Sequence, residues 1–195
     1  MSLYLVVRRL QKQQIERGRI MNGKTLLQWV GTLVVCLVLL MFFAGPVAAV
    51  PITYTFSATG SGTLDDTPFS DAAFTITVYA DTDNVVMVGP GVLIVPDDLS
   101  VIDLEGFGEL VFTTPKRVFD NQNVRALGFS EGLDSADLLD IRNDDFATYD
   151  LTTDFGPDFD PNPFPIWQNP PTPTDQGPLS FYSAHDVTFI AQVGE

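Results

Sequence analysis

Residues 52–80, ITYTFSATGSGTLDDTPFSDAAFTITVYA, decide the fold class of this chain. Apolar residues alternate with threonine and serine along 52–58, and a second alternating run covers 74–80. A period of two residues is typical of strands that bury one face. The segments 60–62 (GSG) and 64–68 (LDDTP) lie between the runs and predict turns. This stretch therefore predicts antiparallel β structure.

Similar short runs continue to the end of the chain. We expect strands at 91–95, 99–104, 109–113, 117–120, 125–129, 146–152, 179–182 and 187–193. Only 135–141 (SADLLDI) has a helical pattern. Strands and helices do not alternate along the sequence, so a parallel sheet is not predicted. Residues 154–178 contain eight prolines and are expected to form a long loop, because proline does not fit an interior strand. The prediction is an all-β antiparallel sandwich of jelly-roll or Ig-like type over residues 50–195.

The first 49 residues have a different character. Residues 26–44 form an uncharged apolar run that follows Lys24, and Val47-Ala48-Ala49 comes shortly after it. This order predicts a signal peptide at 21–49, with a helical apolar core and cleavage after Ala49. Residues 1–20 are then an over-extended start or a basic leader. The alternative is an uncleaved membrane anchor at 26–44, which is long enough to span a bilayer.

Charge separates the same two parts. Residues 1–49 hold six basic groups and one acid, whereas residues 50–195 hold four basic groups and 24 acids, a net charge of −20. Such a domain repels phosphate backbones and anionic lipids, so we expect no nucleic-acid partner, and a membrane partner only if the N-terminal segment stays uncleaved. Cys36 lies in the apolar run, so no disulfide or thiolate metal site is expected after it.

Three segments carry a family resemblance. They are residues 52–85, with the run TGSGTLDDTPFSDAAFTIT at 59–77, RVFDNQNVRALGFSEG at 117–132, and DLLDIRNDDFATYDLTTDFGP at 137–157. They resemble the β-rich domain of bacterial secreted proteins of the PEP-CTERM sorting class, over most of residues 50–193. The Pro-Glu-Pro sorting tail of that class is absent before Glu195. The resemblance implies an extracellular or cell-surface location and no established activity.

Residues 128–132, GFSEG, match the G-x-S-x-G pattern of a hydrolase nucleophile. His185, the single histidine, is the candidate base, with Asp186 beside it. The strand-to-helix context that this pattern requires is not predicted, and strand alternation would place His185 and Asp186 on opposite faces. We therefore expect a glycine-flanked turn, with Ser130 and His185 out of hydrogen-bond reach. A small secreted hydrolase that uses Ser130 is the alternative.

The acids include candidate calcium ligands. Asp81 and Asp83 form one candidate group, and Asp154, Asp158 and Asp160 form another. Carboxylates spaced two residues apart suit Ca²⁺, although no segment matches an EF-hand loop. Further acids recur at Asp134, Asp137 and Asp140 and at Asp144–Asp145. The interpretation that competes with calcium binding is a solvated acidic surface, and no other cofactor is expected.

Four aromatic residues are candidate platforms for sugars: Tyr149, Phe164, Trp167 and Tyr182. The competing interpretation is that they pack the core and the proline-rich loop. Taken together, the sequence predicts a non-catalytic β-sandwich that is secreted or on the cell surface and associates with matrix polysaccharide or a surface protein. A membrane-tethered periplasmic module is a further alternative.

Overall fold

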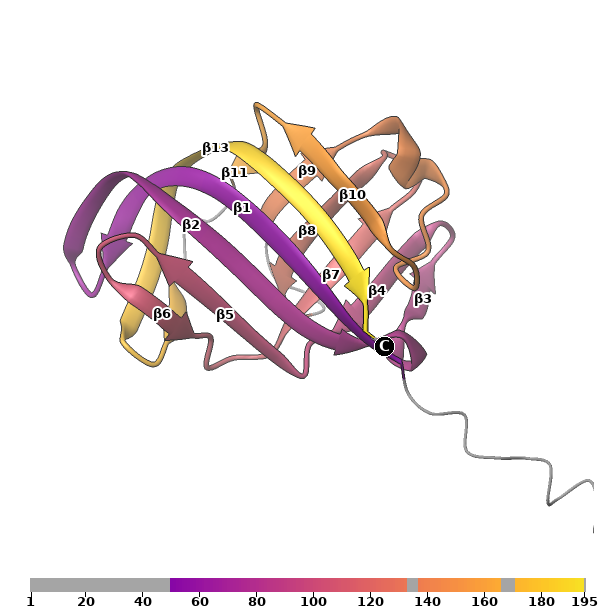
Figure 1. Ribbon diagram of the computed structural model, residues 1–195, viewed down its shortest axis with the longest axis horizontal. Helices are drawn as coiled ribbons and strands as arrows, with labels where there is room; N and C mark the ends of the chain where they lie inside the picture. The colour runs from indigo at the N-terminus through magenta and orange to yellow at the C-terminus, as the bar shows by residue number, and fades with distance from the viewer. Residues whose placement is uncertain (1–49, 133–136, 166–170, 195) are drawn as a thin grey trace, which may run out of the picture. The chain divides into compact units, whose positions relative to one another are not determined.

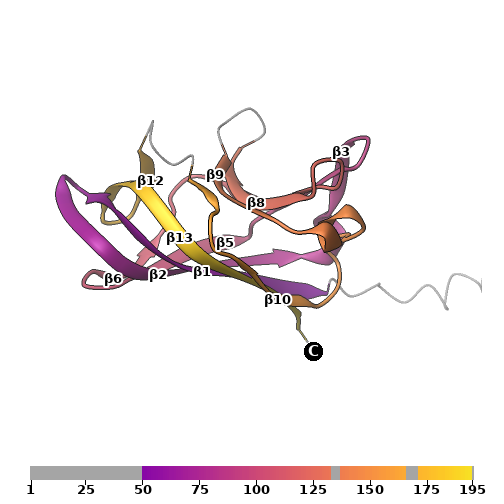
Figure 2. The same ribbon diagram turned by 90° about the horizontal axis from the view of Figure 1, so that it is seen from above.

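The computed structural model describes residues 50–132, 137–165 and 171–194. This part of the chain is an all-β sandwich of two antiparallel sheets, which confirms the predicted fold class. The two sheets form two layers, with β1, β2 and β13 in one and β8 and β9 in the other (Figures 1 and 2). The predicted signal peptide, the leader and the anchor alternative lie outside the described residues.

The seven-stranded sheet has the order β10-β13-β1-β2-β5-β6, and β12 also pairs with β13. Its strands are β1 (Pro51–Leu64), β2 (Thr67–Asp81), β5 (Leu99–Leu104), β6 (Gly108–Val111), β10 (Phe155–Asp160), β12 (Thr172–Thr174) and β13 (Gly177–Val193).

The six-stranded sheet has the order β11-β9-β8-β7-β4-β3. Its strands are β3 (Val86–Gly89), β4 (Val92–Pro96), β7 (Lys116–Asn121), β8 (Ala126–Glu131), β9 (Asp137–Arg142) and β11 (Phe164–Pro165). Two short 3-10 turns, η1 (Thr82–Asn84) and η2 (Asp144–Ala147), complete the regular elements of the described chain. None of its helical segments is long and apolar enough to cross a membrane.

The first hairpin follows the alternation in its sequence. In β1 every second residue from Ile52 is buried, and its neighbours are half-buried. The turn is Asp65-Asp66, with φ of 45° and 63°, the left-handed pair that a two-residue hairpin needs. The turn predicted at 60–62 is wrong, because β1 continues through it. A Cβ at Gly62 would lie 1.9 Å from the carbonyl oxygen of Ser180, so glycine is needed there for the close approach of β13.

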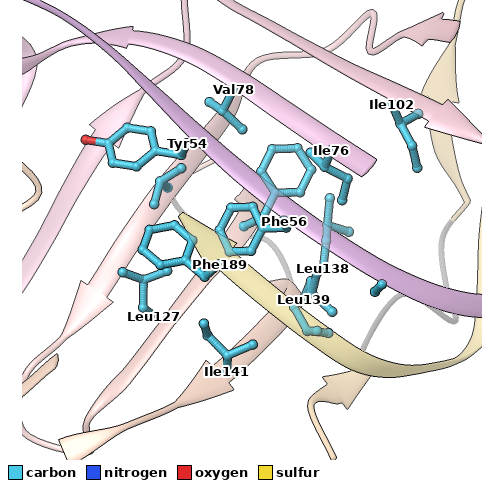
Figure 3. Close-up of a cluster of buried hydrophobic side chains, with 14 of the residues drawn as sticks. Tyr54, Phe56, Ile76, Val78, Ile102, Leu127, Leu138, Leu139, Ile141 and Phe189 are labelled. Carbon is cyan, nitrogen blue, oxygen red and sulfur yellow. The ribbon is translucent and has the colours of Figure 1, made fainter. Parts of the chain in front are cut away.

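The core fills the space between the two sheets (Figure 3). Phe56 of β1 lies at its centre. Its ring centroid is 5.0 Å from that of Phe189 in the same sheet and 6.4 Å from that of Phe129 in the opposite sheet. Burial of large aromatic side chains from both layers is the main stabilising term in such a sandwich.

Two further sequence predictions of secondary structure are wrong. Residues 137–142 form β9 rather than a helix, and a register shift in its pairing with β8 makes Leu138 an extra residue. The bulge lets Leu138 and Leu139 both enter the core, which gives the helix-like spacing in the sequence. Residues 146–152 form η2 and an irregular loop rather than a strand. Phe146, Tyr149 and Leu151 of this segment are buried, and the Tyr54 hydroxyl donates to the Leu151 carbonyl at 2.6 Å.

The long loop predicted at 154–178 is wrong for the described residues, which contain the short strands β10, β11 and β12 and the first two residues of β13. The expectation that the prolines avoid interior strands holds for the three short strands. Strand β10 forms one edge of the seven-stranded sheet, and β12 pairs only with β13. The two residues of β11 form an edge of the other sheet.

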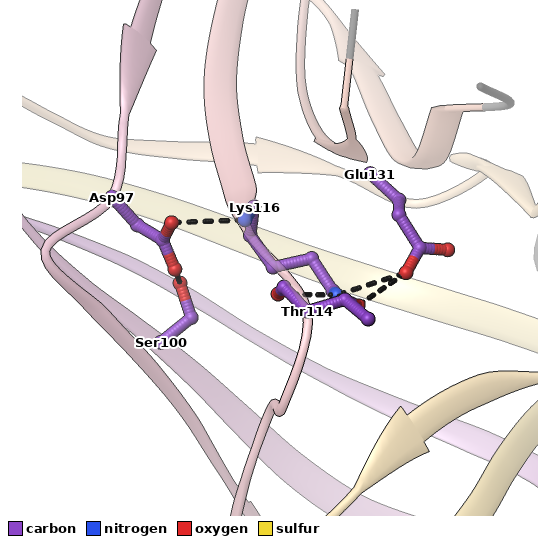
Figure 4. Close-up of polar contacts among 5 residues, drawn as sticks. All are labelled: Asp97, Ser100, Thr114, Lys116 and Glu131. Atoms are coloured by element: carbon purple, nitrogen blue, oxygen red, sulfur yellow. Dashed lines mark hydrogen bonds and ion pairs between the residues drawn. The ribbon is translucent and has the colours of Figure 1, made fainter. Parts of the chain in front are cut away.

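A buried lysine network joins the chain segments that cross between the sheets (Figure 4). The Lys116 side chain is fully buried. Its ammonium group donates to the backbone and side-chain oxygens of Thr114, and Nζ lies 3.2 Å from Glu131 Oε1. Its backbone N–H donates to Asp97, which also accepts from Ser100. Burial lowers the pKa of Lys116, and Glu131 opposes that shift. With these partners satisfied, we interpret the network as structural.

Candidate functional site

The side of the six-stranded sheet that faces away from the core carries a mixed group of side chains. On β7, β8 and β9 the core cluster takes Val118, Leu127, Phe129, Leu139 and Ile141, so the alternate residues lie on the outer side. Cross-strand pairing arranges them in three rows of three. We call these nine residues the outer patch: Arg117, Ser130, Asp137; Phe119, Gly128, Asp140; and Asn121, Ala126, Arg142.

The centre of the outer patch is Gly128. A Cβ at this position would lie 2.4 Å from the Leu139 carbonyl oxygen, 2.6 Å from Asp140 Oδ1 and 2.8 Å from the Phe119 ring. Only glycine therefore leaves room for both the Phe119 ring and the Asp140 carboxylate next to β8. Phe119, Ala126 and the adjoining Ile94 of β4 are buried but lie outside the core cluster. The outer patch thus has a buried floor of its own.

Ser130 belongs to this floor. It lies within β8, so the turn expected at 128–132 is wrong except for Gly132, whose φ is 59°. Its side chain is completely buried, and its Oγ accepts a hydrogen bond of 2.8 Å from Arg117 Nε. The pattern G-x-S-x-G therefore describes a strand whose glycine and serine share the outer side.

His185 lies in the other sheet, paired with Thr59 of β1. Ser130 and His185 share no hydrogen bond, as expected. The prediction that His185 and Asp186 face opposite sides is wrong, because His185 Nδ1 and Asp186 Oδ2 are 2.8 Å apart. Asp186 has a φ of 57°, and this left-handed residue breaks the strand alternation.

Asp137 and Asp140 reach the outer patch through the bulge in β9. In a regular strand residues three apart face opposite sides, but the extra Leu138 puts both carboxylates opposite outward residues of β8. Burial raises the pKa of Asp140 to about 7, with a further rise from Asp137 and a smaller opposing effect of Arg142. Burial also raises the pKa of Asp137 against the effect of Arg117. Asp140 Oδ1 is buried and has no hydrogen-bond partner.

The predicted calcium ligands do not form one group. Among the residues described, no three His, Cys, Asp or Glu side chains come together as a metal-binding group. Asp81 Oδ1 accepts from the Asp83 N–H, Asp160 from the N–H groups of Asn162 and Arg142, and Asp154 from the Val193 N–H. Asp81 and Asp160 thus cap local turns, whereas Asp154 and the second oxygen of Asp160 bind the backbone of distant segments. Calcium binding stays a prediction.

Asp158 is the remaining predicted ligand. Its Oδ1 accepts a hydrogen bond of 2.5 Å from Asn143 Nδ2, and its Oδ2 is buried without a partner. Together with Asp160, it ties β10 to the segment that follows β9. A surface depression of about 530 Å³ lies beside the β10 bulge and is lined by Asp154, Phe155, Gly156, Pro157, Ile190, Ala191 and Gln192.

The aromatic candidates are divided between core and surface. Tyr149 is buried, its ring packs 4.6 Å from that of Phe155, and its hydroxyl donates to Thr153, so it is a core residue. Tyr182 is 56% exposed. The backbone of Phe164 pairs with that of Asp140 in β9, and Trp167 lies outside the described residues.

Asp120 is a second carboxylate with a perturbed pKa. It is fully buried on the core side of β7, and neither carboxylate oxygen has a hydrogen-bond partner. Burial raises its pKa to about 7. Because Asp120 faces the interior, we do not include it in the candidate site.

Sequence reasoning missed the outer patch. In the sequence, Asp137 and Asp140 stand out only as recurring acids, and nothing distinguishes Arg117, Phe119 or Arg142. The available signal was limited to 117–121 and 126–130, where Arg117, Asn121 and Ser130 alternate with core residues; 137–142 does not alternate, because of its bulge. Comparisons with protein-family models, curated proteins and solved structures found no match for this chain.

Proposed function

We propose that this chain is a secreted or cell-surface protein whose β-sandwich associates with extracellular polysaccharide without catalysing a reaction. The outer patch is the observation that carries this proposal. It combines buried residues with two half-buried carboxylates, the half-buried Arg117 and the exposed Arg142, and such groups bind hydroxyls through pairs of hydrogen bonds. The resemblance to secreted proteins of the PEP-CTERM class supports the location.

The surroundings of Ser130 support a non-catalytic role. A serine nucleophile needs a base within hydrogen-bond reach and a path for substrate to its hydroxyl. Here the hydroxyl is sealed in the sheet and bonded to Arg117, and His185 belongs to the other sheet. Within the described chain, Ser130 therefore has a structural role in the outer patch.

Polysaccharide binding can be tested by affinity electrophoresis of the full chain in gels that contain a dissolved polysaccharide. We expect retarded migration in at least one neutral polysaccharide, relative to a gel without it. Bovine serum albumin, also acidic, is the control for non-specific retardation. Migration unaffected by neutral, anionic and cationic polysaccharides alike would refute the proposed association. Release of reducing sugar from the polysaccharide during incubation with the protein would refute the proposal that the protein does not catalyse a reaction.

The hydrolase alternative has its own test. We expect the protein to leave a p-nitrophenyl ester intact at neutral pH. Hydrolysis that disappears in Ser130→Ala, but persists in the surface variant Ser70→Ala, would replace our proposal by the alternative.

The location can be tested by the intact mass of the protein recovered outside the cytoplasm. We expect a mass that corresponds to a chain starting at Val50. A mass that retains residues 21–49 would favour the membrane-tethered alternative.

A further inference from the structure

The outer patch is electrically distinct from the rest of the domain. Residues 50–195 contain only four basic side chains: Lys116, Arg117, Arg125 and Arg142. Lys116 is paired with Glu131 inside the sandwich, and the exposed Arg125 is paired with Asp144. The other two are in the outer patch, where they lie among Asp137 and Asp140. The formal charge of the outer patch is therefore zero in a domain of net charge −20.

This balance restricts the kind of ligand. An anionic polymer would have to approach through the negative field of the domain, and a polycation would bind its other acidic surfaces equally well. A neutral ligand meets no such barrier, and it gains directional hydrogen bonds where donors and acceptors occur together. The outer patch offers both, because guanidinium groups donate and carboxylates accept.

One acceptor in the outer patch lacks a donor. Asp140 Oδ1 lies over Gly128, is buried and makes no hydrogen bond. Its neighbours across the strands are Gly128, which has no side chain, and the backbone of Phe164. An unsatisfied buried acceptor is costly. Asp140 as a whole is half-buried, so a turn of its carboxylate would bring this oxygen to the surface, where a ligand hydroxyl satisfies it.

We propose that the outer patch binds a neutral polyhydroxylated ligand, namely a segment of an uncharged glycan, with Asp140 accepting from a sugar hydroxyl. Asp137 accepts a second hydroxyl, and Arg142, which is exposed at the rim, donates to sugar oxygens. Phe119, Gly128 and Ser130 form the floor that holds the two carboxylates in place. This inference rests on the proposed function and adds the place of binding and the class of glycan.

The test uses the full chain and four probes: dextran and laminarin as neutral glucans, alginate as a polyanion and chitosan as a polycation. Dissociation constants are measured by affinity electrophoresis over a range of glycan concentrations. We expect binding to at least one neutral glucan and at least about 10-fold weaker binding to alginate and chitosan. Asp140→Asn should weaken binding to that glucan by about 10-fold, because the amide replaces one of the two acceptor oxygens by a donor.

Two further variants separate binding from folding. Arg142→Gln changes an exposed side chain and should weaken binding severalfold while leaving the circular dichroism spectrum unchanged. Asp103→Asn, an exposed acid on the outer side of β5 in the other sheet, is the matched control and should bind like the wild type.

The outcomes distinguish the two proposals. Binding of a neutral glucan that neither Asp140→Asn nor Arg142→Gln changes would overturn the assignment of the outer patch and leave the proposed function intact. Preferential binding of alginate or chitosan would overturn the ligand class. If none of the four probes binds, both the inference and the proposed polysaccharide association fail.

Discussion

The buried pair Lys116–Glu131 allows a quantitative test of what stabilises the end of the sandwich. Glu131→Gln keeps the shape of the side chain but removes its charge, so the ammonium of Lys116 remains inside with only neutral acceptors, the Thr114 oxygens and the new amide oxygen. Two unit charges 3.2 Å apart attract each other by about 5 kcal/mol at an effective dielectric constant of about 20. Glu131 is 23% exposed, and solvent screens part of this attraction.

We therefore expect Glu131→Gln to lower the free energy of unfolding by about 2–3 kcal/mol, below the range for a fully buried pair. Lys116→Met keeps the apolar stem and leaves no buried charge, and it should cost only about 1 kcal/mol through its lost hydrogen bonds. The double variant, Lys116→Met with Glu131→Gln, should also lose only about 1 kcal/mol of unfolding free energy, since Glu131→Gln no longer leaves an unpaired ammonium.

The assay is urea unfolding, followed by intrinsic fluorescence and by circular dichroism, of the wild type, both single variants and the double variant. Asp144→Asn removes the surface pair with Arg125, whose side chains are 56% and 85% exposed, and should change stability by less than about 0.5 kcal/mol. If Glu131→Gln costs no more than Asp144→Asn, or if the two single effects simply add, the pair does not act as a buried ion pair.

Three more variants test the sheet, the buried acid and the core. Gly128→Ala should lose about 1–3 kcal/mol of stability, because its Cβ would lie 2.4 Å from a backbone oxygen. Gly89→Ala, whose Cβ would meet nothing closer than 4.0 Å, should change little in the same urea titration, and equal effects would contradict the packing argument. Asp120 has a folded-state pKa of about 7 against an ordinary value of 3.8, so between these values the folded protein binds the extra proton and stability falls as pH rises. Asp120→Asn is neutral throughout and should gain at least about 1 kcal/mol relative to the wild type between about pH 4.5 and about pH 8, whereas parallel pH profiles would show that Asp120 is not buried as an acid. Phe56→Ala should lower the free energy of unfolding by about 3–5 kcal/mol, and a loss below about 1 kcal/mol would mean that the two sheets do not meet at this ring.

Much of the fold could be predicted because its signal is local. The alternation in β1 and β2 requires one buried face, and each side chain in a strand reports its own face. The two glycines at 60 and 62 gave a false turn for a physical reason: glycine is required both where a chain reverses and where another backbone approaches closely. The sequence does not distinguish these two uses.

The outer patch depends on facts that a single strand does not contain. Arg117, Ser130 and Asp137 form one row only because three strands pair in a particular register. Asp137 and Asp140 share a face only because of an extra residue in β9, and the same bulge makes the segment resemble a helix. Register and bulges are set by packing against the rest of the sheet, so pattern analysis could not place this group.

The position of β13 in the seven-stranded sheet fixes the order in which the protein can fold. β13 pairs with β1, so Ile52 lies opposite Val193, and both strands lie in the interior of the sheet. A nascent chain made as far as Thr174 therefore has β1 with one edge unpaired, and the sheet cannot be completed until residues 177–193 have been synthesised. Contacts between such distant parts of a chain form late and slowly. During synthesis the seven-stranded sheet thus stays open until residues 177–193 have left the ribosome.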